Sequence, residues 1–336
     1  MSEPVYQLAP TGTTDEVLDD RTATGRQRPW REKRIRTETV AKGWALAGEP
    51  GRARRCQDCG TWLTFAECLS DGTKHLLRAN FCDQRLCPLC TWRRSMKLTA
   101  EVSAVLHRAA EIWPERAWVM LTLTQRNVPG QDLADEVSRI LHGWSKLRKR
   151  EEFRAIRGWL RTLEVTYNAK ADTWHPHLHV LLQVTPSYFT GRGYVSHARW
   201  VAAWRSVLGL DYDPSVEVHR VRQRASRGAL AAAAAEVGKY TVKDTDLTGN
   251  TPQEASERLL VLDGALAGRR LVAWGGDLRE LAKELEARDE EDLVHITGED
   301  HGPACPVCGS DLVEVVYGWS QLRQAYLRAP DGALSG

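Results

Sequence analysis

Residues His175–Val184 read HPHLHVLLQV, and this stretch decides both the fold and the chemistry that we expect. Side chains alternate along a β-strand, so His175, His177 and His179 share one face while leucines and valines take the other. Two imidazoles two positions apart suit a divalent metal ion. We therefore expect His177 and His179 to be metal ligands. For His175 three roles stay open: a ligand, a neighbour of the ligands or a hairpin residue.

A third ligand is expected from the strand that precedes the histidines. Trp159–Asn168 (WLRTLEVTYN) is rich in apolar and β-branched residues, and the turn-like AKADTW joins it to the histidine strand as a hairpin. Glu164 stands well inside this run and is our candidate; the alternative is an exposed strand carboxylate. Two histidines and one carboxylate suit Mg²⁺ or Mn²⁺ in phosphate chemistry, or iron in an oxygenase.

The elements around the hairpin predict an α+β fold. Residues 117–243 read as strand, helix, strand, strand, helix, strand, helix, and the first six have the order of a ferredoxin-like antiparallel sheet. In that order the third strand is central, and we expect helices on one face and an open face for a ligand. The elements besides the hairpin are a strand Ala117–Gln125, a helix through 133–147, a helix capped by Ser196, a strand Val216–Val221 and a helix from Arg227 to about Lys243.

The last of these helices carries a tyrosine. In EVGKYTVK, Glu236, Tyr240 and Lys243 follow helical spacing and would project from one face. A neighbouring ammonium favours the phenolate and can hold a phosphate, and Glu236 can act as a general base. Alone, the pattern is typical of a surface helix with an ion pair. Together with the histidine strand, it indicates phosphoryl transfer to tyrosine.

Four cysteines in two C-x-x-C pairs predict a zinc ribbon. Cys56 and Cys59 form one pair, Cys87 and Cys90 the other, and a hairpin pattern lies between them. Cys82 can replace one of the four, and we expect Cys68 to be a buried thiol. The second pair is followed by Arg93, Arg94 and Lys97, with Arg85 before it, which suits contact with DNA.

A further pair near the end of the chain, Cys305 and Cys308, is half of a metal site. His301 and His295 can complete it as a second zinc site, or the pair stays without metal. Another basic cluster, Arg220, Arg222 and Arg224, suits phosphate contacts.

Three motifs together resemble the rolling-circle replication initiators of plasmids from Gram-positive bacteria, members of the HUH endonuclease superfamily. The likeness covers about residues 55–245. Its motifs are LTLTQRN (121–127), HPHLHVLL (175–182) and EVGKYTVK (236–243), preceded by the cysteine-rich FCDQRLCPLCTWRRSMK (81–97).

The resemblance implies a mechanism. His177, His179 and Glu164 would hold Mg²⁺ or Mn²⁺ at the scissile phosphate, and Tyr240 would attack it, leaving a free 3′-OH and a 5′-phosphotyrosine. Lys243 would orient the DNA or the phenolate. The tyrosine helix has no second tyrosine, and Glu236 stands where one branch of the family uses a glutamate to activate water. We therefore expect hydrolysis to end the reaction.

Four regions and a set of partners follow from this interpretation. We expect a basic flexible arm at 1–50, the zinc ribbon at 51–98, the HUH nuclease domain at 99–247 and a helical C-terminal region at 248–336 with an acidic segment. The chain has no long apolar run and no visible secretion signal, so we expect a cytoplasmic protein without a membrane partner. Plasmid origin DNA, host helicase and host polymerase are the expected partners.

Three rival interpretations remain. A relaxase shares the HUH chemistry but usually carries its tyrosine before the histidine strand, whereas Tyr240 follows that strand here. A single-tyrosine transposase shares the chemistry too, but it normally lacks the cysteine-rich segment that this chain has. A zinc-ribbon DNA-binding regulator without enzymatic activity would use the histidines structurally. An iron oxygenase needs a barrel of many strands, and the element order disagrees with one.

Overall fold

The computed structural model describes residues 14–330, except 23, 190, 192, 222–227, 239–241, 295–303 and 306–307. It is a mixed α and β structure whose paired strands are all antiparallel. The chain forms two compact units: residues 1–91 with 250–256 and 294–336, and residues 92–249 with 257–293. Both units are therefore assembled from segments far apart in the sequence.

The second unit contains a five-stranded sheet with the order β6-β3-β5-β4-β7. The histidine strand β5 is central in this order, as the sequence predicted. Glu164 of β4 stands directly opposite His177 of β5 in the strand register. The strands are β3 (Ala117–Leu123), β4 (Ile156–Asn168), β5 (Thr173–Val184), β6 (Val216–Val221) and β7 (Val272–Gly276).

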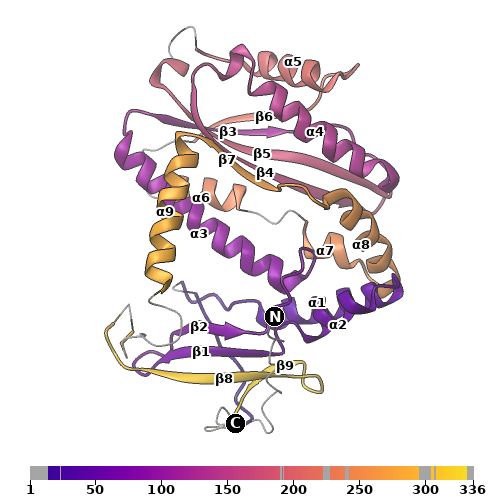
Figure 1. Ribbon diagram of the computed structural model, residues 1–336, viewed down its shortest axis with the longest axis vertical. Helices are drawn as coiled ribbons and strands as arrows, with labels where there is room; N and C mark the ends of the chain where they lie inside the picture. Colours follow the sequence, from indigo (N-terminus) through magenta and orange to yellow (C-terminus); the bar gives the residue numbers. More distant parts are fainter. Residues whose placement is uncertain are drawn as a thin grey trace. The chain divides into compact units, whose positions relative to one another are not determined.

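Helices lie on both faces of this sheet, although the sequence predicted one open face (Figure 1). The helices α4 (Leu133–Leu147) and α5 (His197–Leu208) lie on one face, and α3 (Pro88–Ile112), α6 (Gly228–Val237) and α9 (Asp277–Val294) on the other. The histidine face continues along β5 as Leu181, which packs with Val105 of α3 and Ala234 of α6 in one buried cluster. Helices cover the apolar part of this face because burial of apolar surface is favourable. The histidine end is the part of the face that remains for a functional site.

The helix expected to reach Lys243 ends earlier. α6 stops at Val237, Gly238 follows in a turn, and Lys243 has extended backbone before the short helix α7 (Asp244–Thr248). The alanine run has the highest helix propensity and glycine a low one, so the helix ends where the alanine-rich segment does. Glu236 and Lys243 are therefore not on one helix.

The first unit contains a four-stranded sheet with the order β2-β1-β8-β9. β1 (Trp62–Cys68) and β2 (Lys74–Ala79) form the expected hairpin, and β8 (Leu312–Ser320) and β9 (Ala325–Arg328) pair alongside β1. The prediction of a helical region over 248–336 was wrong at three strands: β8 and β9 complete the N-terminal sheet, and β7 joins the five-stranded sheet. The remaining helix, α8 (Pro252–Leu266), was expected.

The prediction of a flexible arm over residues 1–50 was also wrong for its second half. Trp30–Leu46 forms helix α1, and α2 follows at Pro50–Asp58. Trp30 is buried and meets Phe65 of β1 edge to face, with ring centroids 5.9 Å apart. Burial against the sheet orders a segment whose sequence is mostly polar. Every helix among the described residues is too short or too polar to cross a membrane.

Candidate functional site

Three donor atoms converge on the histidine end of the five-stranded sheet. The Nε2 atoms of His177 and His179 lie 3.2 Å and 2.8 Å from Oε2 of Glu164. All three residues are buried, with 5% to 8% of their surface exposed. The hairpin register produces this arrangement, because it sets Glu164 opposite His177 and Thr162 opposite His179. Glu164, His177 and His179 form a group that could hold a metal ion.

Electrostatics keep the Glu164 carboxylate charged. Burial on its own raises the pKa of Glu164, but hydrogen bonds from His177 and His179, and their charges, outweigh it and hold the pKa well below its ordinary value. The pKa of His175 is lowered, first by burial and then by His177. The ring of His175 lies 5.1 Å from that of His177, outside the three-residue group.

A second carboxylate reaches the same place from α6. Oε1 of Glu236 lies 3.7 Å from Nδ1 of His179, and Oγ1 of Thr122 on β3 lies 3.5 Å from that nitrogen. The Glu236 side chain keeps 37% of its surface exposed. It is thus accessible to water while it touches a histidine of the group. The sequence did not single out Thr122, although pairing of β3 with β5 places it opposite His179.

A cleft of about 540 Å³ opens beside this group. It is lined by His175 and His177, by Thr124, Gln125 and Arg126 after β3, and by Tyr212. Gln125 is only 6% exposed, and within the described part of the chain neither atom of its amide group has a hydrogen-bond partner. A buried amide without a partner is costly, and a bound ligand would satisfy it.

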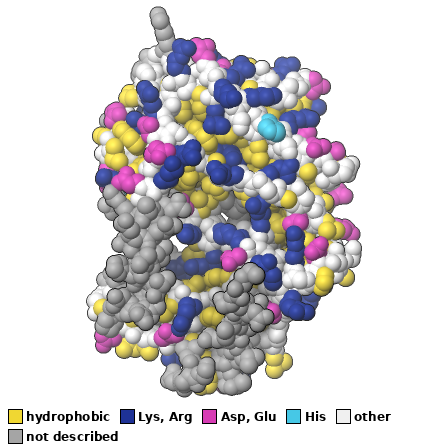
Figure 2. All heavy atoms as spheres, viewed as in Figure 1, with side chains coloured by type: hydrophobic (Ala, Val, Ile, Leu, Met, Phe, Trp, Pro, Cys, Tyr) yellow, Lys and Arg dark blue, Asp and Glu magenta, His cyan; other side chains and the backbone are white. Residues whose placement is uncertain are grey.

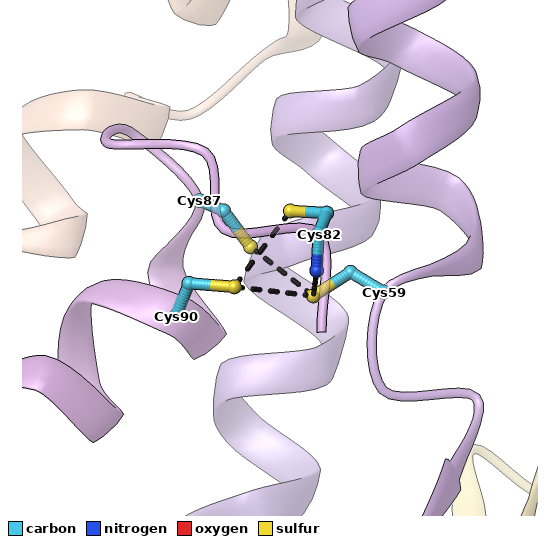
Figure 3. Close-up of side chains that lie close together, drawn as sticks. All are labelled: Cys59, Cys82, Cys87 and Cys90. Atoms are coloured by element: carbon cyan, nitrogen blue, oxygen red, sulfur yellow. Dashed lines mark hydrogen bonds between the residues drawn. The ribbon is translucent and has the colours of Figure 1, made fainter. Parts of the chain in front are cut away.

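The cysteines of the first unit gather at one point (Figure 3). Cys59 follows α2, Cys82 follows β2, and Cys87 and Cys90 lie at the start of α3. The sulfur of Cys59 is 3.5 Å from that of Cys90 and 3.6 Å from that of Cys87, and the sulfurs of Cys82 and Cys90 are 3.7 Å apart. These four could hold a metal ion.

This group differs from the expected set by one residue. Cys82 belongs to it, and Cys56 lies beside it, with its thiol hydrogen-bonded to Cys82 and Cys87. Hydrogen bonds from Cys56, Cys59 and Cys87 lower the pKa of Cys82 to about 4. The Cys82 thiolate is thereby favoured near neutral pH. The C-x-x-C pattern pointed to Cys56 because spacing alone does not show which sulfurs turn inward.

A second cysteine group contains a residue for which we expected no ligand role. Cys68 at the end of β1 lies with Cys305 and Cys308, and these three could hold a metal ion. The sulfurs of Cys68 and Cys308 are 3.4 Å apart. His301 and His295, the expected partners of this pair, lie outside the described residues.

Several other predicted site residues lie outside the described residues: Tyr240, Arg222 and Arg224. Arg220 is exposed, with its guanidinium 4.2 Å from the centroid of the Phe189 ring. Arg85, Arg94 and Lys97 are exposed as well, and Arg93 is half-buried. Lys and Arg side chains are also spread over the face of the five-stranded unit that Figure 2 shows.

Comparison with known proteins identifies the family. Residues 73–327 match a family described as "Replication protein". A "Protein rep" of Bacillus amyloliquefaciens is 37% identical over 308 residues, which cover 84% of this chain and 90% of that protein. A "Protein rep" of Streptococcus pneumoniae serotype 2 is 32% identical over 318 residues, which cover 93% of this chain and 95% of that protein. No solved structure matches the chain. The chain therefore belongs to this replication protein family, and the resemblance to rolling-circle plasmid replication initiators is confirmed.

Proposed function

We propose that the protein starts rolling-circle replication by nicking one strand of plasmid origin DNA in an HUH-type active site. The observation that carries this proposal is the convergence of Glu164, His177 and His179, with Glu236 in contact with His179. The strand order around β5, in which the third strand of the ferredoxin-like order is central, supports an HUH fold.

The donor set fits a divalent ion. The carboxylate oxygen of Glu164 lies within hydrogen-bond distance of both imidazole nitrogens, and the three atoms lie within 4.8 Å of one another. They can therefore turn to a common ion and leave positions for phosphate oxygens. Mg²⁺ or Mn²⁺ bound there would polarise the scissile phosphate. The low pKa of Glu164 keeps its carboxylate ionised and available at neutral pH.

Tyr240 is the proposed nucleophile. Its phenolic oxygen forms a bond to the phosphorus, the bond from phosphorus to the 3′ oxygen breaks, and that oxygen leaves as a 3′-OH. The phenol gives up its proton, and the 3′ oxygen takes one from solvent. The product is a 5′-phosphotyrosine, which conserves the phosphodiester so that the strand can be rejoined. Lys243 is proposed to orient the DNA or the phenolate.

Glu236 is proposed to end the reaction. It is half exposed and borders His179, so a water molecule can reach its carboxylate next to the ligands. As a general base it takes a proton from that water, whose oxygen forms a bond to the phosphorus of the phosphotyrosine. The bond from phosphorus to the Tyr240 oxygen breaks, and the phenolate takes up a proton. Hydrolysis releases the protein without a covalent link and prevents another round.

The cleft beside the ligands is proposed to hold the DNA strand. Its lining includes His175 and His177, and also Arg126 and Tyr212, whose ring centroid lies 3.7 Å from the Arg126 guanidinium. Gln125 offers a free amide donor and acceptor inside the cleft, which suits a base edge. Exposed Arg85, Arg94, Lys97 and Arg220 are proposed to contact phosphates, as are Arg93, Arg222 and Arg224.

Zinc is the proposed ion of the four-cysteine group. Four sulfurs bound at about 2.3 Å in a tetrahedron lie about 3.8 Å from each other. The observed separations of 3.5 Å to 3.7 Å are close to this value. A closed site of four thiolates has no position for substrate, so its role is structural.

A covalent adduct tests the proposal. The protein is incubated with single-stranded origin DNA and Mn²⁺ and then run on a denaturing gel. We expect a protein–DNA band that Tyr240→Phe abolishes and that Tyr194→Phe, at an exposed tyrosine of the same unit, retains. No adduct with any divalent ion would refute the nuclease and favour a DNA-binding regulator.

A further inference from the structure

We propose that Cys68, Cys305 and Cys308 bind a second zinc ion, which links the end of β1 to the segment before β8. This inference is independent of the proposed nuclease activity, since all three residues belong to the first unit. Cys68 is 240 residues from Cys308 in the sequence, yet their sulfurs are 3.4 Å apart.

Backbone hydrogen bonds join Cys305 to the residues that follow Cys308. The amide of Cys305 donates to the carbonyl of Ser310 at 2.6 Å, and the amide of Gly309 donates to the carbonyl of Cys305 at 2.8 Å. Gly309 has φ +74, a conformation that glycine adopts without strain. The sulfurs of Cys305 and Cys308 lie within 4.8 Å of each other.

Strand pairing brings Cys68 to the same turn. Cys68 pairs with Leu312 in the register of β1 and β8, and the amide of Leu69 donates to the carbonyl of Asp311 at 3.1 Å. Cys68 and Cys305 are 1% and 3% exposed, whereas Cys308 faces solvent. Two of the thiols are thus buried and the third lies at the surface. An ion can therefore reach the group from solvent on the side of Cys308.

His75, which lies outside the three-cysteine group, is the proposed fourth ligand. It pairs with Ala66, two residues before Cys68, so the register puts His75 on the same face of the sheet as Cys68. Its Nε2 atom is buried, and among the described residues no hydrogen-bond partner contacts it. Three thiolates and one imidazole are a common structural zinc set.

A disulfide is the competing explanation for the short Cys68–Cys308 distance. It would use two of the three sulfurs and leave Cys305 buried beside them without a role. Three converging sulfurs are what a metal site requires, and a zinc ion bound there contributes its binding energy to folding. The ion would hold the start of β8 against the end of β1.

The zinc content of the full-length protein tests this inference. We expect two zinc ions per chain in the protein purified under reducing conditions, and one in Cys68→Ser and in Cys305→Ser. His75→Ala should keep the second ion but lose it faster to a chelator. Leu69→Ser, at an exposed neighbour of Cys68, should keep both.

Two outcomes would overturn the inference. One is wild-type zinc content in folded Cys68→Ser, checked by circular dichroism. The other is a Cys68–Cys308 disulfide, detected by mass spectrometry of alkylated peptides, in protein that holds a single zinc ion. Neither readout uses DNA, so failure of the nicking proposal would leave this test intact.

Discussion

The side chains of His179 and Glu236 meet at 3.7 Å, which brings α6 to the histidine end of β5. Four peptide links separate Glu236 from Tyr240, and a chain of that length spans at most about 14 Å. The contact therefore limits how far the proposed nucleophile can be from the proposed ligands. If Tyr240 acted far from the histidines, the contact between Glu236 and His179 would have to break.

Replacement of a proposed ligand should weaken metal binding and, with it, adduct formation. We expect Glu164→Gln and His179→Ala to weaken Mn²⁺ binding by more than about 100-fold, since even residues that only support ligands contribute ~10–100-fold. Calorimetric titration with Mn²⁺ measures the affinity. Glu217→Gln, at an exposed carboxylate lining the same cleft, is the control and should bind Mn²⁺ normally. Equal affinity in Glu164→Gln would remove Glu164 from the ligand set.

Replacement of Glu236 should separate nicking from release. In Glu236→Gln we expect the adduct to form at a similar rate and then to persist, because a general base contributes roughly 10²–10⁴-fold to hydrolysis. A time course of adduct on denaturing gels measures both steps. Loss of the initial nicking step in this variant would assign Glu236 to metal binding or to Tyr240 instead.

Gly238 should be required for the position of the segment that follows α6. A Cβ atom there would lie 2.3 Å from Oγ1 of Thr99 and 2.9 Å from the carbonyl oxygen of Ala234. We expect Gly238→Ala to lower the adduct yield, and Thr99→Ala to restore part of it by removing the closest atom. Gly264→Ala is the matched control, since a Cβ there meets nothing within 4 Å. A normal adduct yield in Gly238→Ala would show that the close approach of Gly238 to Thr99 is not needed for nicking.

The two cysteines that the sequence could not separate should differ in zinc retention. We expect Cys82→Ser to lose the zinc of the four-cysteine group and Cys56→Ser to keep it, because only Cys82 has its sulfur among the four that converge. Release of zinc to a colorimetric chelator measures the difference. The reverse order would restore the pairing that C-x-x-C spacing suggests.

Acid should lower the free energy of unfolding by protonating the Glu152 carboxylate. Burial raises the pKa of this carboxyl, but hydrogen bonds from its own backbone amide, Arg199 and Arg150 outweigh it and lower the pKa. A lowered pKa means that the stabilisation is complete above the ordinary carboxyl pKa and is lost as the pH falls through the lowered value.

We expect Glu152→Gln to lower the free energy of unfolding by about 1 kcal/mol at neutral pH and by little in acid. Urea unfolding at several pH values measures this. Glu111→Gln, in an exposed pair with Arg108, should change stability little at any pH. A constant difference between Glu152→Gln and the wild type across pH would contradict the assignment.

Local patterns predicted four of the five strands of the five-stranded sheet and missed β7. The expected strand Val216–Val221 and the Ser196 cap match the structure, with Ser196 accepting from the amide of Arg199. The convergence of Glu164 with His177 followed from hairpin register, which alternation and turn length determine. These features depend on residues close in the sequence, so a single amino-acid sequence is enough to predict them.

Contacts between distant segments were beyond such patterns. Nothing in the sequence near Cys68 indicates that Leu312 pairs with it, so Cys68 was expected to be only a buried thiol. The polar α1 is ordered by burial of Trp30 against β1, which its own sequence does not reveal. The loop after β2 places the sulfur of Cys82, rather than that of Cys56, in the four-cysteine group. The C-x-x-C spacing in the sequence does not indicate how such a loop folds.

Pairing of β8 with β1 has a consequence for synthesis of the protein. A ribosome releases β1 long before β8, so the growing chain exposes one edge of β1 until the last strands emerge. An uncovered edge recruits other strands and favours aggregation. Supply of the initiator would then depend on chaperones that protect the nascent polypeptide, and chains cut short before residue 312 would be degraded rather than accumulate as partly active fragments.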